Sequence, residues 1–156
     1  MRSHTVVDSP VAPLTLVDDD GALAGLYMAD QRHLPDPASF GPRDDGVQPA
    51  LREQLTAYFA GELREFDVPL AVAGTPFQQA VWAALREVPY GTTCTYGDLA
   101  AAIGRPTAVR AVGAANGRNP VCIVVPCHRV VGSGGSMTGY AGGVERKQHL
   151  LALEQQ

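Results

Sequence analysis

Short apolar runs alternate with turn-forming residues near the start of the chain. Three runs, Thr5–Val7, Leu14–Val17 and Leu23–Met28, are separated by two prolines and by an Asp-Asp-Asp-Gly segment. Short apolar runs bounded by Pro, Gly and Asp are typical of strands that tight turns connect. The pattern predicts a small antiparallel sheet.

Helical spacing follows the Pro- and Asp-rich segment 31–46, which we interpret as a loop. Between residues 47 and 59 apolar side chains recur every three or four positions, and this spacing predicts a helix with one buried face. Residues 68–72 form another apolar run, which contains a proline. Because proline is confined to the edges of sheets, this run fits an edge strand or an extended linker.

A second helix is predicted to begin just after Thr75. Thr75, Pro76 and Gln78 are typical of an N-cap, a first helical position and the third position after the cap. Two shorter helices, at 96–103 and 107–116, are separated by Gly-Arg-Pro, and this spacing fits a helix-turn-helix. The pattern is weak by itself, because many helical hairpins share it and bind no DNA.

The second helix of this pair is slender. It consists mainly of small residues around a single arginine, Arg110. An arginine on a helix is usually solvated or bound to phosphate, but small neighbours allow close approach to a partner. The narrow minor groove of DNA would favour this profile.

Length and charge divide the chain into two unequal parts. The 156 residues are 46% apolar, enough for a core in one compact domain or two small ones. Residues 1–74 carry five basic and twelve acidic side chains, a charge of −7, whereas residues 75–156 carry seven and four, a charge of +3. We expect an α+β fold, with a small antiparallel sheet and a helix in an N-terminal α/β structural domain (1–74). A mainly helical C-terminal domain (75–156) would contain the helix-turn-helix, and its positive charge suits contact with phosphates.

Cysteine usage indicates a reducing environment. Cys94, Cys122 and Cys127 make an odd number without a CxxC spacing, and the chain shows neither a secretory signal nor an apolar run near the ~20 residues that cross a membrane. We expect free thiols, a cytoplasmic location and no membrane contact. The four histidines are scattered along the sequence, so we expect no metal site and no cofactor.

The segment Pro126–Val131 places a cysteine directly before a histidine at the end of an apolar run. A free thiol has a pKa of about 8.5, so an imidazole that takes its proton makes the sulfur a far better nucleophile at neutral pH. Cys127 is therefore a candidate nucleophile, with His128 as its base. A buried cysteine is more often a small core residue, so the motif needs support from the rest of the chain.

Eight short motifs supply that support. They are Phe77–Trp82, Pro89–Gly91, Thr95–Ala100, Arg110–Gly113, Asn119–Pro120, Pro126–Val130, Gly139–Gly143 and Lys147–Glu154. In this order they closely resemble the O6-alkylguanine-DNA alkyltransferases. The resemblance covers residues 75–156 with high specificity, while residues 1–74 match in general character only. Some members of that family bind zinc in the N-terminal part, but this chain lacks the ligands.

The resemblance implies DNA repair by self-alkylation. Such proteins move an alkyl group from O6 of a damaged guanine, and often from O4 of thymine, onto their own cysteine in a single irreversible turnover. Cys127 would be the acceptor, His128 would take its proton through a bridging water, and Glu154 would orient and charge the imidazole. Tyr96 would donate its phenolic proton toward N3 of the departing base.

The resemblance also implies that the target base is rotated out of double-stranded DNA, with protein contacts in the minor groove. Arg110 would fill the gap in the base stack, and Asn119 would connect the recognition helix to the active-site strand. Family members often carry Ser where this chain has Ala141, which leaves only the backbone amide there. The other implied positions are Thr107, Ala111, Gly113, Tyr96 and Arg129 for DNA contact, and Val130, Ser136, Tyr140, Ala141 and Lys147 for the base pocket. We expect a monomer, and the sequence leaves cooperative binding along DNA open.

Three other classes of protein share parts of this pattern. A helix-turn-helix transcription regulator would account for the basic half but would not need Cys127, His128 and Glu154. A non-catalytic alkyltransferase-like protein binds the same lesions, but such relatives lack the acceptor cysteine. A cysteine hydrolase normally needs a histidine far along the chain. Self-alkylating repair is therefore the leading hypothesis.

Overall fold

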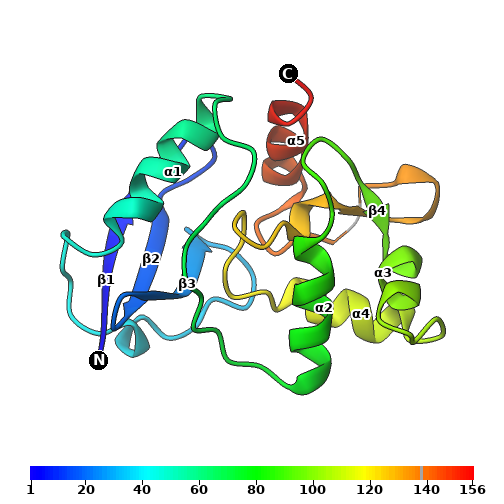
Figure 1. Ribbon diagram of the computed structural model, residues 1–156, viewed down its shortest axis with the longest axis horizontal. Coiled ribbons are helices and arrows are strands. Elements are labelled where there is room, and N and C mark those ends of the chain that lie inside the picture. Colours follow the sequence, from blue (N-terminus) through cyan, green and yellow to red (C-terminus); the bar gives the residue numbers. More distant parts are fainter. Residues whose placement is uncertain (138) are drawn as a thin grey trace.

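The computed structural model describes residues 1–137 and 139–156. Figure 1 shows two halves, with the sheet and α1 on one side and the remaining helices on the other. The sheet is antiparallel with the strand order β1-β2-β3, as the sequence predicted. Its strands are β1 (Arg2–Val7), β2 (Leu14–Asp19) and β3 (Ala22–Met28).

A two-residue turn joins β2 to β3. Asp20 and Gly21 both have positive φ, as a tight hairpin turn requires, and the Gly21 N–H donates to Asp18 Oδ2 over 3.1 Å. The Asp- and Gly-rich segment that the sequence marked as a turn therefore sets the register of these strands.

The first helix, α1 (Pro49–Phe59), lies over the sheet and starts two residues later than the apolar spacing indicated. It starts there because proline favours the first helical position, where an N–H is not needed. Leu51, Leu55 and Tyr58 form its buried face and belong to the main hydrophobic core. A short 3-10 helix, η1 (Pro37–Phe40), interrupts the loop that precedes α1.

The free edge of β3 is covered by two segments from further along the chain. Residues 69–71 exchange backbone hydrogen bonds with Leu23, at 2.8 and 2.9 Å, so the run expected as an edge strand or an extended linker makes a single bridge to the sheet. Residues 120–122 pair in the same way with Leu26, at 2.8 and 3.3 Å. Covering an edge satisfies its backbone groups. The second contact places the sheet directly behind the segment that leads to Cys127.

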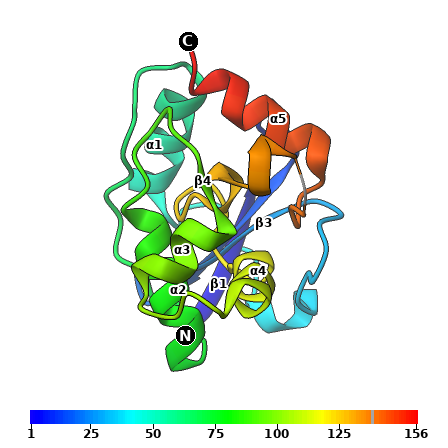
Figure 2. The same ribbon diagram turned by 90° about the vertical axis from the view of Figure 1, so that its right-hand side faces the viewer.

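The second half is mainly helical. Figure 2 shows α3 and α4 side by side at one end of the molecule, with α5 at the other end. Within the described residues, no helix has the length and apolar character that crossing a membrane requires. The helices are α2 (Pro76–Arg86), α3 (Tyr96–Ala102), α4 (Val109–Gly117) and α5 (Val144–Leu153).

The predicted start of α2 is confirmed in detail. The Gln78 N–H donates to Thr75 Oγ1 over 3.1 Å, and the Thr75 N–H donates to Gln78 Oε1 over 3.0 Å, which forms a complete capping box. On the buried face of α2, the Trp82 indole N–H donates to the carbonyl of Ala115 on α4 over 2.9 Å. Helix α2 is therefore the support on which the helix-turn-helix rests.

The second helix of the helix-turn-helix begins at Val109, so the prediction that it starts at Thr107 was wrong. The Ala108 N–H donates to the Arg105 carbonyl over 2.9 Å, which closes a turn, and Ala108 has the non-helical angles φ −91° and ψ 33°. The two residues after Pro106 belong to this turn, so the helix starts only at Val109. Thr107 is exposed in the turn.

Candidate active site

A strained backbone turn presents Cys127. Ile123 has a φ of +71°, which is costly for a β-branched residue. Backbone hydrogen bonds hold the turn, from the Val125 N–H to the Val121 carbonyl at 3.0 Å and from the Cys127 N–H to the Val125 carbonyl at 2.8 Å. Cys127 then opens the 3-10 helix η2 (Cys127–Arg129) and is 4% exposed.

Asn119 braces the same turn. Its Nδ2 donates to the Val125 carbonyl over 2.8 Å, and its Oδ1 accepts from the Val121 N–H over 3.1 Å. Asn119 lies two residues after the last residue of α4, so the side chain joins that helix to the backbone beside Cys127. Asn116, which the sequence reasoning missed, is buried and points its Nδ2 at the Cys127 carbonyl over 3.5 Å.

His128 and Glu154 form a buried pair. His128 Nε2 lies 2.7 Å from Glu154 Oε2, and both side chains are fully shielded from solvent. We assign the imidazole proton to Nε2, because the carboxylate can only accept. His128 Nδ1 makes no hydrogen bond within the part of the chain that the structure describes. It is the nitrogen left to take a proton from another group.

Arg129 completes this group instead of facing DNA. Its Nε and Nη2 donate to the two oxygens of Glu154 over 2.8 and 3.0 Å, and its Nη1 donates to the Val88 carbonyl over 2.8 Å. The expected DNA contact of Arg129 is therefore corrected, because its guanidinium is buried and its donors are committed. Burial raises the pKa of Glu154, but hydrogen bonds from His128, Arg129 and Tyr58 outweigh it and hold this pKa at about 2.

The thiol is protonated at rest. Burial raises the pKa of Cys127 to about 11, while the Asn119 side chain, the Lys147 ammonium and the Tyr140 hydroxyl offset part of the rise. Burial also lowers the pKa of His128, although Glu154 opposes this change. The imidazole is therefore neutral at pH 7 and able to accept a proton, and a thiolate must be generated within the site.

A pocket of about 340 Å³ opens between the helix-turn-helix and the loop that follows β5 (Val130–Val131). This volume is within the range of small-ligand sites. Tyr96 lies on its wall, with its hydroxyl donating to the Gly139 carbonyl over 3.2 Å. The pocket is lined by Arg32, His33, Tyr96, Gly113, Ala114, Gly117, Gly139, Tyr140 and Ala141.

Several predicted residues lie away from this lining. Ser136 is exposed on the loop after β5, and Val130 is buried within that strand. Lys147 is fully buried on α5, and its charge lowers the pKa of Cys127. Arg110 and Ala111 are exposed on α4, the surface on which the sequence placed DNA contact.

The sequence reasoning missed three residues from the N-terminal half. Tyr58 reaches Glu154 from α1. Arg32 and His33 line the pocket from the loop after β3, where the Arg32 N–H donates to the Ala141 carbonyl over 2.8 Å. No local pattern marks any of them, because each position depends on how the two halves pack.

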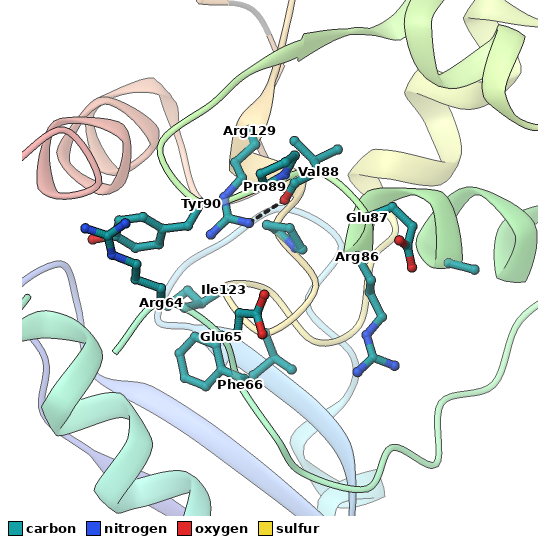
Figure 3. Close-up of a pocket in the computed structure, with 13 residues that line it drawn as sticks. Arg64, Glu65, Phe66, Arg86, Glu87, Val88, Pro89, Tyr90, Ile123 and Arg129 are labelled. Carbon is teal, nitrogen blue, oxygen red and sulfur yellow. Dashed lines mark hydrogen bonds between the residues drawn. The ribbon is translucent and has the colours of Figure 1, made fainter. Parts of the chain in front are cut away.

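A larger groove, of about 500 Å³, lies elsewhere (Figure 3). It runs between the segment after α1 and the end of α2 and shares no lining residue with the pocket at Tyr96. We place the chemistry at the smaller pocket, because that is where Tyr140, whose hydroxyl acts on Cys127, forms part of the wall. Among the described residues, no group of three metal-binding side chains could hold an ion.

The structure combines a buried cysteine, a buried His–Glu pair and a pocket that a helix-turn-helix borders. This combination defines a class of protein that carries a candidate cysteine nucleophile together with a helix-turn-helix. Residues 76–156 match the family described as "6-O-methylguanine DNA methyltransferase, DNA binding domain". Residues 3–72 match the "6-O-methylguanine DNA methyltransferase, ribonuclease-like domain". The chain therefore belongs to the 6-O-methylguanine DNA methyltransferase family.

Individual relatives match over nearly the whole chain. The methylated-DNA–protein-cysteine methyltransferase of Mycobacterium tuberculosis is 51% identical over 154 residues, which cover 99% of this chain and 93% of that protein. The protein of the same name from Methanosarcina acetivorans is 49% identical and covers 97% of both chains. The crystal structure of Mycobacterium tuberculosis OGT in complex with DNA superposes with a TM-score of 0.93 at 50% identity, covering 98% of this chain and 92% of that one.

Proposed function

We propose that this protein repairs DNA by moving an alkyl group from O6 of an alkylated guanine onto Cys127 Sγ, once per chain. The observation that carries the proposal is the buried Cys127, which is followed by the His128–Glu154 pair and whose pKa is lowered by Tyr140 from the wall of the pocket beside the helix-turn-helix. The two relatives described above, which are 51% and 49% identical, bear a name that states methyl transfer between methylated DNA and a protein cysteine, and this supports the proposal. O4-alkylthymine is the second substrate that the same chemistry would accept.

The reaction begins with a proton transfer. The Cys127 proton passes to His128 Nδ1 through a bridging water, and the imidazolium keeps its Nε2 proton on Glu154. The carboxylate remains charged, because its pKa is about 2. The resulting thiolate is a soft and strong nucleophile.

A nucleophilic displacement follows. The sulfur attacks the alkyl carbon, so that the C–S bond forms as the bond from carbon to O6 breaks, and guanine leaves with the electron pair. The Tyr96 hydroxyl turns from the Gly139 carbonyl to N3 of the base and donates its proton, which neutralises the charge on the leaving group. Asn119 holds the turn at the attacking residue throughout.

The lesion reaches the pocket by base flipping, because O6 is inaccessible within a duplex. Helix α4 approaches the minor groove, and Arg110 fills the gap that the extruded base leaves. Gly113 belongs to the wall of the pocket, where a side chain would take the space of the base. Residues 75–156 thus carry DNA binding and alkyl acceptance, residues 1–74 have a supporting role, and the protein acts as a monomer in the reducing cytoplasm.

Intact-mass spectrometry after mixing with an O6-methylguanine duplex tests the reaction. We expect one added methyl group per chain, a plateau that longer incubation does not raise, because a thioether has no good leaving group. Cys127→Ser should abolish the addition while lesion binding survives, and the matched controls Cys94→Ser and Cys122→Ser should still accept one methyl group. Methyl addition in Cys127→Ser at a comparable rate, or more than one equivalent per wild-type chain, would contradict the proposal.

A further inference from the structure

Tyr58 makes a hydrogen bond that the proposed reaction does not require. Its hydroxyl donates to Glu154 Oε2 over 2.6 Å, although the two residues are 96 positions apart in the sequence. Tyr58 belongs to the last turn of α1, in the N-terminal half, and is fully buried. The N-terminal half therefore places a polar group directly on the carboxylate that serves His128.

Glu154 Oε2 is crowded with donors. It accepts from Tyr58 at 2.6 Å, from His128 Nε2 at 2.7 Å and from Arg129 Nη2 at 3.0 Å, while Oε1 accepts from Arg129 Nε at 2.8 Å. Arg129 by itself already gives each oxygen of the carboxylate a charged hydrogen-bond donor. The Tyr58 bond is thus an addition to a carboxylate that is already paired, on the same oxygen that binds the imidazole.

The Tyr58 ring is fixed by aromatic neighbours. It packs edge-on against Phe59 and Tyr90, with ring centroids 5.2 and 6.3 Å apart, and at a tilt against Phe66 at 5.2 Å. Tyr90 in turn contacts Arg129, whose guanidinium carbon lies 5.6 Å from its ring centre, on the wall of the groove in Figure 3. The same aromatic group therefore orients both Tyr58 and Arg129 toward Glu154.

We propose that Tyr58 is a positioning residue of the alkyl-transfer centre, whose hydroxyl sets how strongly Glu154 stabilises the His128 imidazolium. This inference rests on the proposed function, in which His128 takes the Cys127 proton. Hydrogen-bond donors to the same carboxylate oxygen compete with one another. Each additional donor draws negative charge from the oxygen and so weakens the hydrogen bonds that this oxygen accepts from the other donors. Tyr58 thereby keeps the proton on His128 rather than on Glu154, at the cost of a less stabilised imidazolium.

The donor is permanent across the working pH range. Burial and the adjacent Glu154 raise the pKa of Tyr58, so the phenol does not ionise. The charged and titratable groups that act on this centre are His128 and Arg129 from η2, Tyr58 from α1 and Tyr90 from the segment after α2, with Lys147 of α5 acting on His128. Among the side chains that donate a hydrogen bond to Glu154, Tyr58 is the one in which a single atom can be removed without altering a charge.

The test is the pH dependence of single-turnover transfer from free O6-benzylguanine, which needs no DNA binding. Tyr58→Phe removes the hydroxyl and keeps the ring, so the carboxylate becomes more basic, stabilises the imidazolium more and raises the pKa of His128. Because only the neutral imidazole can take the Cys127 proton, the acidic limb of the rate profile should move to higher pH. We expect the limb to shift by roughly half a pH unit, which corresponds to a fraction of the free energy of one hydrogen bond. Glu154→Gln removes the charge, lowers the pKa of His128 and should move the limb the opposite way, toward lower pH. Tyr27→Phe, at a buried tyrosine in a separate cluster, should leave it in place.

The outcomes separate the two proposals. If Glu154→Gln moves the limb and Tyr58→Phe does not, Tyr58 only packs and the inference is overturned, while the proposed function stands. If neither variant moves it, Glu154 is outside the relay and the inference fails with it, whereas methyl transfer to Cys127 is judged separately by mass. Should Tyr58→Phe not fold, site-specific 3-fluorotyrosine at position 58 replaces it. This stronger donor weakens the hold of Glu154 on the imidazolium and should move the limb to lower pH, and an unmoved limb would again overturn the inference.

Discussion

Arg110 and Arg129 show how differently the fold can use the same side chain. Arg110 is exposed on α4, and nothing in the structure neutralises its charge by an ion pair among the described residues. Arg129 is buried, and it gives three of its donors to Glu154 and Val88. Only Arg110 is therefore available to a duplex, and substitutions at the two positions should fail in different ways.

Arg110→Ala should slow repair of duplex DNA roughly 10- to 100-fold, because flipping a base costs a few kcal/mol and each 1.4 kcal/mol is a factor of ten in rate. Reaction with free O6-benzylguanine should be unchanged, since no base has to be extruded. Single-turnover rates on both substrates measure this, with Arg86→Ala, an exposed arginine on α2, as the matched control. Equal losses on both substrates would mean that Arg110 supports the fold or the pocket.

Helix α2 matters to the site without touching its pocket. No residue of α2 lines the pocket at Tyr96, but Trp82 holds α4 through the Ala115 carbonyl. The stability of α2 depends in part on its capping box, which satisfies N–H groups that the helix itself leaves free. A change in the cap of α2 can therefore alter the stability of the protein without altering its transfer rate.

Thr75→Ala should lower the free energy of unfolding by about 1 kcal/mol, the typical loss of an N-cap side chain. The transfer rate on free O6-benzylguanine should remain unchanged in the folded variant. Urea denaturation and single-turnover kinetics provide the two measurements. Thr56→Ala, at an exposed threonine inside α1, is the control and should cost less, because alanine favours a helix interior. A transfer rate that falls with stability would show that α2 reaches the pocket.

At the scale of the whole molecule, the two halves share one hydrophobic core. A single cluster of buried residues contains Leu14 and Tyr58 from the first half together with Val121, Cys127 and Leu150 from the second. Backbone hydrogen bonds between β3 and residues 120–122 cross the same boundary. Neither half can therefore unfold without exposing apolar surface on the other.

We expect urea to unfold the protein in one cooperative transition. NMR amide signals of β2 and of α4 should disappear at the same urea concentration, and the fluorescence of Trp82, the only tryptophan, should change there too. Coincident midpoints are the expected result. A clear separation between the midpoints of β2 and α4 would show that the halves are independent domains in stability.

The sequence by itself determined the local features, which depend on residues that are close together in the chain. The antiparallel sheet, the capping box at Thr75 and the order of the two short helices follow from local spacing, turn residues and caps, which act within a few positions of one another. Cys127 and His128 are adjacent, so the sequence alone indicated them as a candidate pair. The start of α4 was missed by two residues, because Pro106 fits a turn as well as a helix start.

The tertiary structure decided which side chains surround the chemistry. Arg129 looked like a DNA contact until the fold buried it against Glu154, and Tyr58 gave no signal of its position on the same carboxylate. Arg32 and His33 reach the pocket only because the loop after β3 packs on the segment at Ala141. Contacts of this kind join residues from distant parts of the chain. They are fixed by the packing of one common core, which no local pattern in the sequence specifies.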